Sequence, residues 1–212
     1  MAIVTGGING PFKGKVGSVY GYTMMGKNII KGAPRKSAKN KRGSAAQKAS
    51  RSKFTKMQHF LQPVLPFIQI GFNMVGRSKQ MSAHNAAKSY NMLNAFTPEG
   101  EIDYSKVLVS FGNLPGPLTA QVETGDTGLH FNWTNALDAS GVRRSDQVML
   151  LAYNTEHKFT YFMFSGARRT AEKESLGLWK NKTTYPYHTW IAFISDDRQH
   201  ISMSMYLGEV TI

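Results

Sequence analysis

The stretch GYTMMGKN, residues Gly21–Asn28, comes closest to a phosphate-binding loop in this sequence. It fits the G-x-x-x-x-G-K pattern, but Asn28 stands where that loop needs a Ser or Thr hydroxyl to hold magnesium. Such a loop also needs a helix directly after it, and the residues IIKGAP that follow favour a strand and then a break. We therefore interpret Gly26-Lys27 as the turn of a β-hairpin and not as a nucleotide site.

The histidines and carboxylates form no pattern typical of a catalytic or metal site. No two of the six histidines are spaced four residues apart, and no HExxH motif occurs. Asp196, Asp197 and His200 could be imagined as metal ligands, but their place between two strand patterns favours a polar turn. The absence of cysteine excludes disulfides and thiol chemistry. We predict a protein that is not an enzyme and has no cofactor, metal or small-molecule substrate.

The segment from Ala33 to Phe54 is strongly basic: eight of its 22 residues are Lys or Arg and none is acidic. It could be a solvated loop and helix face, a membrane-surface site, or a site for an anionic protein or for nucleic acid. A membrane site needs large apolar residues beside the cations, and residues 33–53 have none. Nucleic acid fits best, because Lys and Arg neutralise phosphates without reading sequence. The residues expected to contact phosphate are Arg35, Lys36, Lys39, Lys41, Arg42, Lys48, Arg51 and Lys56.

The two halves of the chain differ in charge. Residues 1–98 contain 16 Lys or Arg and no acid, whereas residues 99–212 contain ten Lys or Arg and all 13 acids, so the net charges are +16 and −3. The split indicates a half that faces a polyanion and an ordinary soluble half. The sequence thus predicts two domains, a basic region of hairpin, arm and helices at 1–98 and a β-sandwich at 99–212.

The hairpin is predicted to have strands near 16–24 and 28–31, with apolar side chains that two strands cannot bury. These side chains must pack either on the chain's own helices or, by strand addition, on the sheet edge of a neighbouring subunit, and the charged linker that follows favours the neighbour. The residues expected to pack on a partner are Val16, Val19, Tyr20, Tyr22, Ile29 and Ile30.

Two helices are predicted after the basic arm. The first has Ser44 as its N-cap and extends to about Gln62, where two prolines end or kink it. Its apolar side consists of Phe54, Met57 and Leu61. The second helix follows Ser82 and extends to Phe96. The residues expected to point inward from it are Ala86, Tyr90 and Leu93.

From Lys106 onward, short apolar runs alternate with turn signals about every ten residues, which is typical of a β-sandwich. The runs include KVLVSF at 106–111, and we expect residues 104–212 to fold alone. The segment LWKNKTTYPYHTW, residues 178–190, is unusually aromatic. We expect Trp190 in the core. Trp179, Tyr185 and Tyr187 could cover the end of the sandwich, or they could stack on a partner, for which a protein is favoured over a sugar.

The runs LHFNW, DQVMLLAYN and WIAFISDDRQHISMSMYLG resemble a fibronectin type III or immunoglobulin-like module. The whole chain resembles a family of bacterial and phage-associated proteins with a GSVxGYxxxGxxIIK hairpin, a basic linker and a Q-x-x-x-R-x-x-F helix. The matching residues are Gly17–Tyr22, Gly26–Lys31, Gln47, Arg51 and Phe54. The resemblance implies an α+β fold, in which an N-terminal β-hairpin, a basic arm and two helices precede an all-β sandwich of this kind. It implies no enzymatic activity.

These observations predict a non-enzymatic structural protein that self-assembles, such as a phage capsid or other virion component, with its basic N-terminal part on nucleic acid. One alternative is an accessory, nucleoid-type protein that binds nucleic acid without forming a particle. Another is a sandwich module that binds a surface ligand through its aromatic segment. The sequence has neither a secretion signal nor a membrane-spanning run, so we expect no membrane partner and a location in a virion or the cytoplasm.

Overall fold

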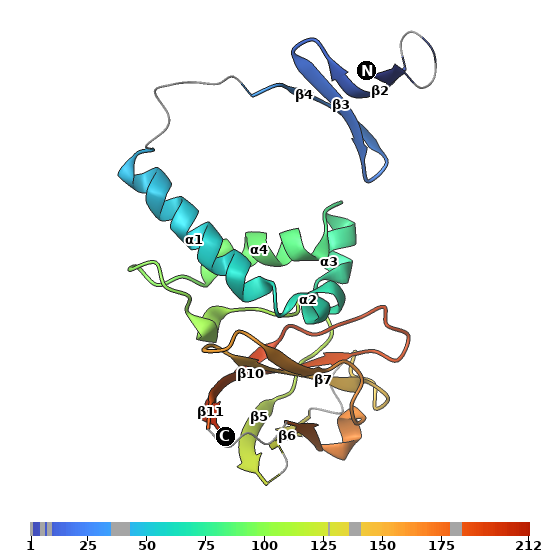
Figure 1. Cartoon of the computed structure of the whole chain (residues 1–212). Helices are drawn as coiled ribbons and strands as arrows, with labels where there is room; N and C mark the ends of the chain where they lie inside the picture. The colour runs from blue at the N-terminus through green and yellow to red at the C-terminus, as the bar shows by residue number, and fades with distance from the viewer. Residues whose placement is uncertain are drawn as a thin grey trace. The chain divides into compact units, whose positions relative to one another are not determined.

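The computed structural model describes residues 2–4, 7, 10–34, 43–126, 128–135, 141–178 and 184–212. The chain forms two compact units, an N-terminal unit, Met1–Lys48, and a C-terminal unit, Ala49–Ile212 (Figure 1). The units divide well before the boundary that composition suggested between residues 98 and 99. None of the helices in the described part of the chain is both long and apolar enough to span a membrane.

The N-terminal unit is a four-stranded antiparallel sheet in the order β1-β2-β3-β4. The strands are β1 (Ile3–Val4), β2 (Phe12–Val16), β3 (Val19–Met24) and β4 (Lys27–Gly32). Met25 and Gly26 both have positive φ, 49° and 77°, which is the backbone of a two-residue hairpin turn. The predicted hairpin is confirmed, but its turn lies one residue before the predicted Gly26-Lys27, because Lys27 begins β4 and pairs with Met24.

The strand expected at 16–24 is not continuous, because Gly17, at φ 54°, and Ser18 turn the chain back onto β2. The predicted hairpin is therefore part of a larger sheet. Two further strands upstream of this turn complete the four.

Four helices follow: α1 (Ala45–Leu61), α2 (Leu65–Gly71), α3 (Asn73–Ser78) and α4 (Ala83–Asn94). Ser44 Oγ accepts from the Gln47 backbone NH at 3.3 Å, and the Gln47 side chain accepts from the Ser44 NH at 3.0 Å. This capping box confirms Ser44 as the N-cap of α1. Ser82 Oγ likewise accepts from the Asn85 NH and caps α4.

The inward faces of these helices match the predictions in part. Met57 and Leu61 are buried, as expected, but Phe54 is half exposed and lies beneath the Lys88 ammonium at 4.3 Å from its ring centre. Leu93 is 84% exposed, so the inward position assigned to it is wrong. Asn91 is buried instead.

The C-terminal unit contains two antiparallel sheets. The first has the order β5-β6-β9, with β5 (Thr119–Gly125), β6 (Gly128–Thr134) and β9 (Lys173–Gly177). The second has the order β11-β10-β7-β8, with β7 (Gln147–Asn154), β8 (Thr160–Met163), β10 (Pro186–Ile194) and β11 (Met205–Thr211). The α+β class and the sandwich of sheets are confirmed.

The segment KVLVSF is not a strand of either sheet, which corrects the prediction. It begins in a short 3-10 helix, η2 (Tyr104–Lys106), and continues as an extended chain. The Asn91 amide accepts from the Leu108 NH and donates to the Leu108 carbonyl, each at 2.9 Å. A side-chain amide from α4 thus replaces a neighbouring strand at this point.

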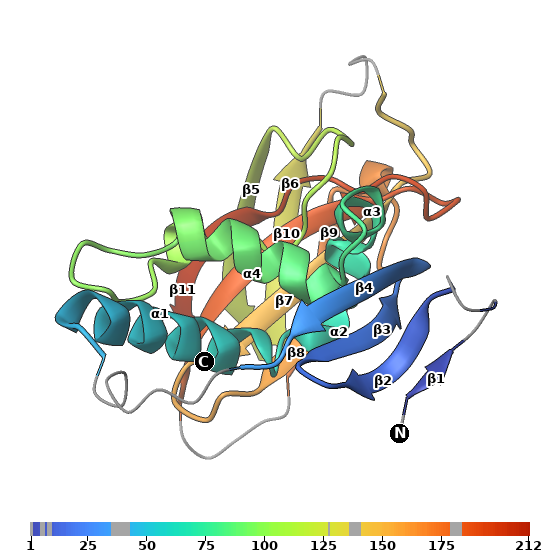
Figure 2. The ribbon, with the colours of Figure 1, turned by 90° about the horizontal axis from the view of Figure 1, so that it is seen from above.

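The middle strands of the four-stranded sheet in the C-terminal unit, β7 and β10, are buried on both faces. Met149, Leu151 and Trp190 belong to a core shared with the helices, whereas Val148 and Leu150 belong to a second core between the two sheets. Figure 2 shows α1 and α4 lying across this sheet, so the unit has three layers and not the two of a simple sandwich. Double burial explains why residues 148–153 of β7 and 190–194 of β10 are continuously apolar and do not alternate.

The three layers change the expectation for the fragment 104–212. Without the helices, Met149, Leu151, Tyr153, Trp190 and Ala192 would lose their cover, and burying a large apolar side chain contributes about 1.5–3 kcal/mol. We therefore expect this fragment to aggregate or to lose fixed tertiary structure, whereas a 43–212 fragment, which keeps the α1 cap, stays soluble and folded. Near-UV circular dichroism and size-exclusion chromatography of the two fragments compare them directly. A monomeric, cooperatively unfolding 104–212 fragment would contradict this.

Candidate functional site

The structure describes three of the eight residues predicted to contact phosphate. Lys48 and Arg51 are exposed on α1. Lys56 is partly buried, and its ammonium donates to the Gly100 carbonyl at 3.0 Å and pairs with Glu101. The Lys56 ammonium thus already forms an ion pair with a carboxylate of its own chain. The arm residues lie outside the described residues: Arg35, Lys36, Lys39, Lys41 and Arg42.

The N-terminal sheet brings lysines and tyrosines together on one side. Register pairs Lys15 with Tyr20 and Tyr20 with Lys31, so these three side chains form a row across strands β2, β3 and β4. Side chains that face each other across an antiparallel sheet, and those two apart along a strand, share a face. We call this side the lysine–tyrosine face. It consists of Ile3, Lys13, Lys15, Tyr20, Tyr22, Met24, Lys27, Ile29 and Lys31.

Both tyrosine rings of this face are open to solvent. Tyr20 is 39% exposed and Tyr22 is 40% exposed, and the Lys15 ammonium lies 5.8 Å from the centre of the Tyr20 ring. No carboxylate of the N-terminal unit neutralises the four lysines, because residues 1–98 contain none. The face can therefore offer positive charge and aromatic surface at once.

The opposite side of the sheet carries no charge, and we call it the apolar face. It consists of Val4, Phe12, Gly14, Val16, Val19, Gly21, Thr23, Asn28, Ile30 and Gly32. Val16 is 49% exposed and Ile30 is 66% exposed. Gly21 is required here, because a Cβ atom at this position would lie 2.2 Å from the Phe12 carbonyl oxygen and 2.7 Å from its ring.

The residues that sequence reasoning assigned together to a partner surface therefore divide. Val19 lies on the apolar face, whereas Tyr20, Tyr22 and Ile29 lie on the lysine–tyrosine face. The alternation K-x-K in β2 and Y-x-Y in β3 is visible in the sequence, but only the register shows that the two patterns share a side.

The aromatic segment 178–190 contributes mainly to the core. Trp190 is fully buried, as predicted, and its indole NH donates to the Val107 carbonyl at 3.2 Å. Tyr187 is 2% exposed and packs edge-on against Phe159, so it is not available to a partner. Tyr185 is partly buried. Trp179 lies outside the described residues.

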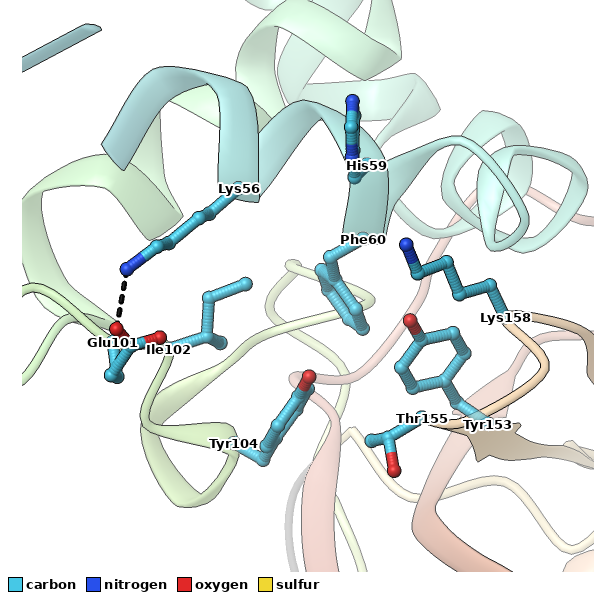
Figure 3. Close-up of a pocket in the computed structure, with 9 residues that line it drawn as sticks. All are labelled: Lys56, His59, Phe60, Glu101, Ile102, Tyr104, Tyr153, Thr155 and Lys158. Atoms are coloured by element: carbon cyan, nitrogen blue, oxygen red, sulfur yellow. Dashed lines mark hydrogen bonds and ion pairs between the residues drawn. The ribbon is translucent and has the colours of Figure 1, made fainter. Parts of the chain in front are cut away.

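The C-terminal unit has a pocket of about 390 Å³ that the sequence did not predict (Figure 3). Its floor is aromatic: Phe60 meets Tyr153 and Tyr104 edge-on, with ring centres 5.1 and 5.7 Å apart. Burial raises the pKa of both Tyr104 and Tyr153, so both phenols stay neutral hydrogen-bond donors. The lining residues are Lys56, His59, Phe60, Glu101, Ile102, Tyr104, Tyr153, Thr155 and Lys158.

Figure 3 shows how the charged side chains of the pocket lie. In Figure 3 the Lys56 side chain points to Glu101, and the His59 ring points away from the aromatic floor. No group of three or more histidine and carboxylate side chains able to hold a metal occurs in the part of the chain that the structure describes. The pocket thus combines an aromatic floor with the ammonium of Lys158.

Asp197, once considered as a metal ligand, is held by donors of its own turn. Its carboxylate accepts from Ser195 Oγ at 2.6 Å and from the Gln199 NH at 2.9 Å, and pairs with Arg143 at 3.1 Å. The Ser195 hydrogen bond, the Gln199 NH and Arg143 together lower the pKa of Asp197 to about 2. These contacts confirm the predicted polar turn between β10 and β11.

The fold and these surfaces define a class: an α+β protein in which helices cover an antiparallel β-sandwich, preceded by a separate, acid-free sheet. The model of a family of unknown function, DUF6266, matches residues 11–208, and the chain belongs to this family. No curated protein and no solved structure matches the chain.

Proposed function

We propose that the chain is a non-enzymatic structural protein that assembles with copies of itself and holds nucleic acid through its N-terminal unit. A capsid protein or another phage virion component combines these two properties. The observation that carries the proposal is the N-terminal sheet, which has a lysine–tyrosine face on one side and an apolar face on the other.

The charge of the N-terminal unit favours a polyanion as its partner. Residues 1–48 contain ten Lys or Arg and no acid, so the cations repel one another unless an external anion neutralises them. Phosphates of nucleic acid do so with release of counterions, in a way that depends on salt and not on base sequence.

The apolar face favours self-association. A sheet with one apolar face gains stability when that face is covered, and Val4, Val16 and Ile30 are all about half exposed or more. We assign the cover to the same face of a second copy, because one patch meeting itself about a two-fold axis gives a closed contact. Residues 99–212, at −3, would also attract the +16 half of a neighbouring subunit.

We further propose that the sandwich is of the fibronectin type III kind. Its first, second and fifth strands form one sheet, and its other four strands form the second sheet in the order seventh, sixth, third, fourth. This strand order supports that assignment, because the chain passes between the two sheets after the second, fourth and fifth strands. The helices over the four-stranded sheet are an addition to such a module.

The arm can be tested separately from the sheet. Changing its five cations to Gln should weaken binding to all sequences and flatten the salt dependence by about 0.9 for each lost duplex phosphate contact, with the melting temperature nearly unchanged. Fluorescence anisotropy at several salt concentrations measures both. The variant carries Gln at Arg35, Lys36, Lys39, Lys41 and Arg42. The matched control carries Gln at five exposed cations of the C-terminal unit, Lys106, Arg144, Lys158, Arg168 and Lys173. Equal binding by the two variants would refute the arm's role.

Electron microscopy of the purified protein, with and without nucleic acid, tests the proposal as a whole. We expect closed or filamentous particles. Monomers or dimers that still bind nucleic acid would favour the accessory, nucleoid-type alternative instead, and a monomer without affinity for nucleic acid would end the proposal.

A further inference from the structure

The row formed by Lys15, Tyr20 and Lys31 places an aromatic ring between two ammonium groups. Neighbouring strands lie about 4.8 Å apart, so each lysine can reach the edge of whatever lies on the ring. Tyr22 lies two residues further along β3, about 7 Å from Tyr20, and carries Ile29 beside it and Lys13 on the same face of β2. The surface thus carries a second exposed ring with one lysine, Lys13, on the neighbouring strand.

A ligand that uses this surface must carry negative charge on its outside and flat aromatic groups that it can expose. Single-stranded nucleic acid has both, whereas a duplex hides its base faces inside the stack. Four-stranded sheets that hold single strands elsewhere do so with exposed aromatic side chains on their middle strands, and β3 is a middle strand here. An acidic protein surface would pair with the lysines, but it would offer no flat group to stack on the two tyrosine rings.

We propose that the lysine–tyrosine face binds single-stranded nucleic acid, with one base stacked on Tyr20, the next on Tyr22, and the phosphates on the surrounding lysines. This inference rests on the proposed function, because it names the form of nucleic acid that the N-terminal unit holds. The arm supplies charge without selectivity, and the sheet supplies the preference for single strands.

The experiment measures binding of the full chain to a labelled thymidine oligonucleotide of about 20 residues and to a duplex of the same length. Tyr20→Ile and Tyr22→Ile keep a strand-forming apolar residue but remove the ring. Each should weaken single-strand binding about tenfold and leave duplex binding unchanged. Tyr20→Phe and Tyr22→Phe, the matched controls, should bind like the parent chain. Lys15→Gln with Lys31→Gln should weaken both ligands.

The outcomes separate this inference from the proposed function. A parent chain that binds neither oligonucleotide overturns both. A parent chain that binds both, with unchanged single-strand affinity in the Tyr→Ile variants, overturns the stacking face and leaves the proposed function standing. Tighter binding to vesicles containing anionic lipid than to either oligonucleotide also overturns the inference. Loss of the single-strand preference in the Tyr→Ile variants alone supports it.

Discussion

Arg169→Met is expected to destabilise the C-terminal unit by about 3–5 kcal/mol. The Arg169 and Asp146 side chains are both fully buried, with Nε and Oδ2 3.3 Å apart. Arg169 also donates to the Pro115 carbonyl at 2.7 Å and to the Gly116 carbonyl at 3.3 Å, and its guanidinium lies 3.9 Å from the centre of the Phe193 ring.

Removing only the cation leaves the Asp146 carboxylate buried without a counter-charge, and that uncompensated charge dominates the cost. Burial lowers the pKa of Arg169, while Asp146 opposes the shift. Asp146 Oδ1 already has no hydrogen-bond partner, and Oδ2 accepts from the Arg143 backbone NH at 3.2 Å, a neutral contact that remains once the guanidinium is gone. The pair thus ties the loop at Pro115–Gly116 to the sandwich core.

Urea unfolding of Arg169→Met checks this result, and a fall of roughly 6–20 °C in melting temperature should accompany it. Arg168→Met is the matched control, because Arg168 is the adjacent residue and is exposed; we expect its effect to stay within about 0.5 kcal/mol. The double variant Arg169→Met with Asp146→Leu should recover part of the loss. A cost below about 1 kcal/mol for Arg169→Met would show that the pair does not secure the core.

The sequence predicted what local chemistry determines. Ser44 with Gln47 is a capping box whose two partners are three residues apart, and Gly26 is the residue that a tight hairpin turn demands. Trp190 was correctly placed in the core, and the apolar run 191–194 follows it directly. These signals depend on neighbours in the chain and not on the rest of the fold.

The incorrect predictions concern segments whose structure depends on contacts between residues that are distant in sequence. The KVLVSF run has the alternation of a strand, yet Asn91 satisfies its backbone from a helix. The unbroken apolar runs at 148–153 in β7 and 190–194 in β10 are typical of strands covered on both faces, and this signal could have predicted the helical layer. The Arg169–Asp146 pair has no sequence signature, because its partners are joined only by the fold.

The residue types of the lysine–tyrosine face could be predicted from the sequence, but their placement on one side of the sheet could not. The chain's positive charge and the Y-x-Y and K-x-K spacings are present in the sequence, but a shift of one residue in register would place the tyrosines and lysines on opposite sides. The register is fixed by the turns at Gly17 and Gly26 together. The division into two faces therefore required the structure.

Deleting residues 1–32 is expected to abolish assembly and leave a folded, soluble chain. The deletion removes all four strands of the N-terminal sheet and retains every residue of both C-terminal cores. The arm remains, so weak, salt-sensitive binding to nucleic acid should persist while the particles disappear. Light scattering after size-exclusion chromatography, together with electron microscopy, measures the loss.

Point substitutions identify which face of the sheet makes the contact. Val16→Thr with Ile30→Thr places hydroxyls on the apolar face while keeping strand-forming residues, and this pair should disrupt assembly as the deletion does. The matched control, Ile3→Thr with Met24→Thr, changes two similarly exposed residues on the lysine–tyrosine face and should assemble normally. A truncated chain that aggregates would instead make the sheet part of its own subunit's core. If the truncated chain forms normal particles, the N-terminal sheet does not make the contact between subunits, because the deletion has removed its apolar face.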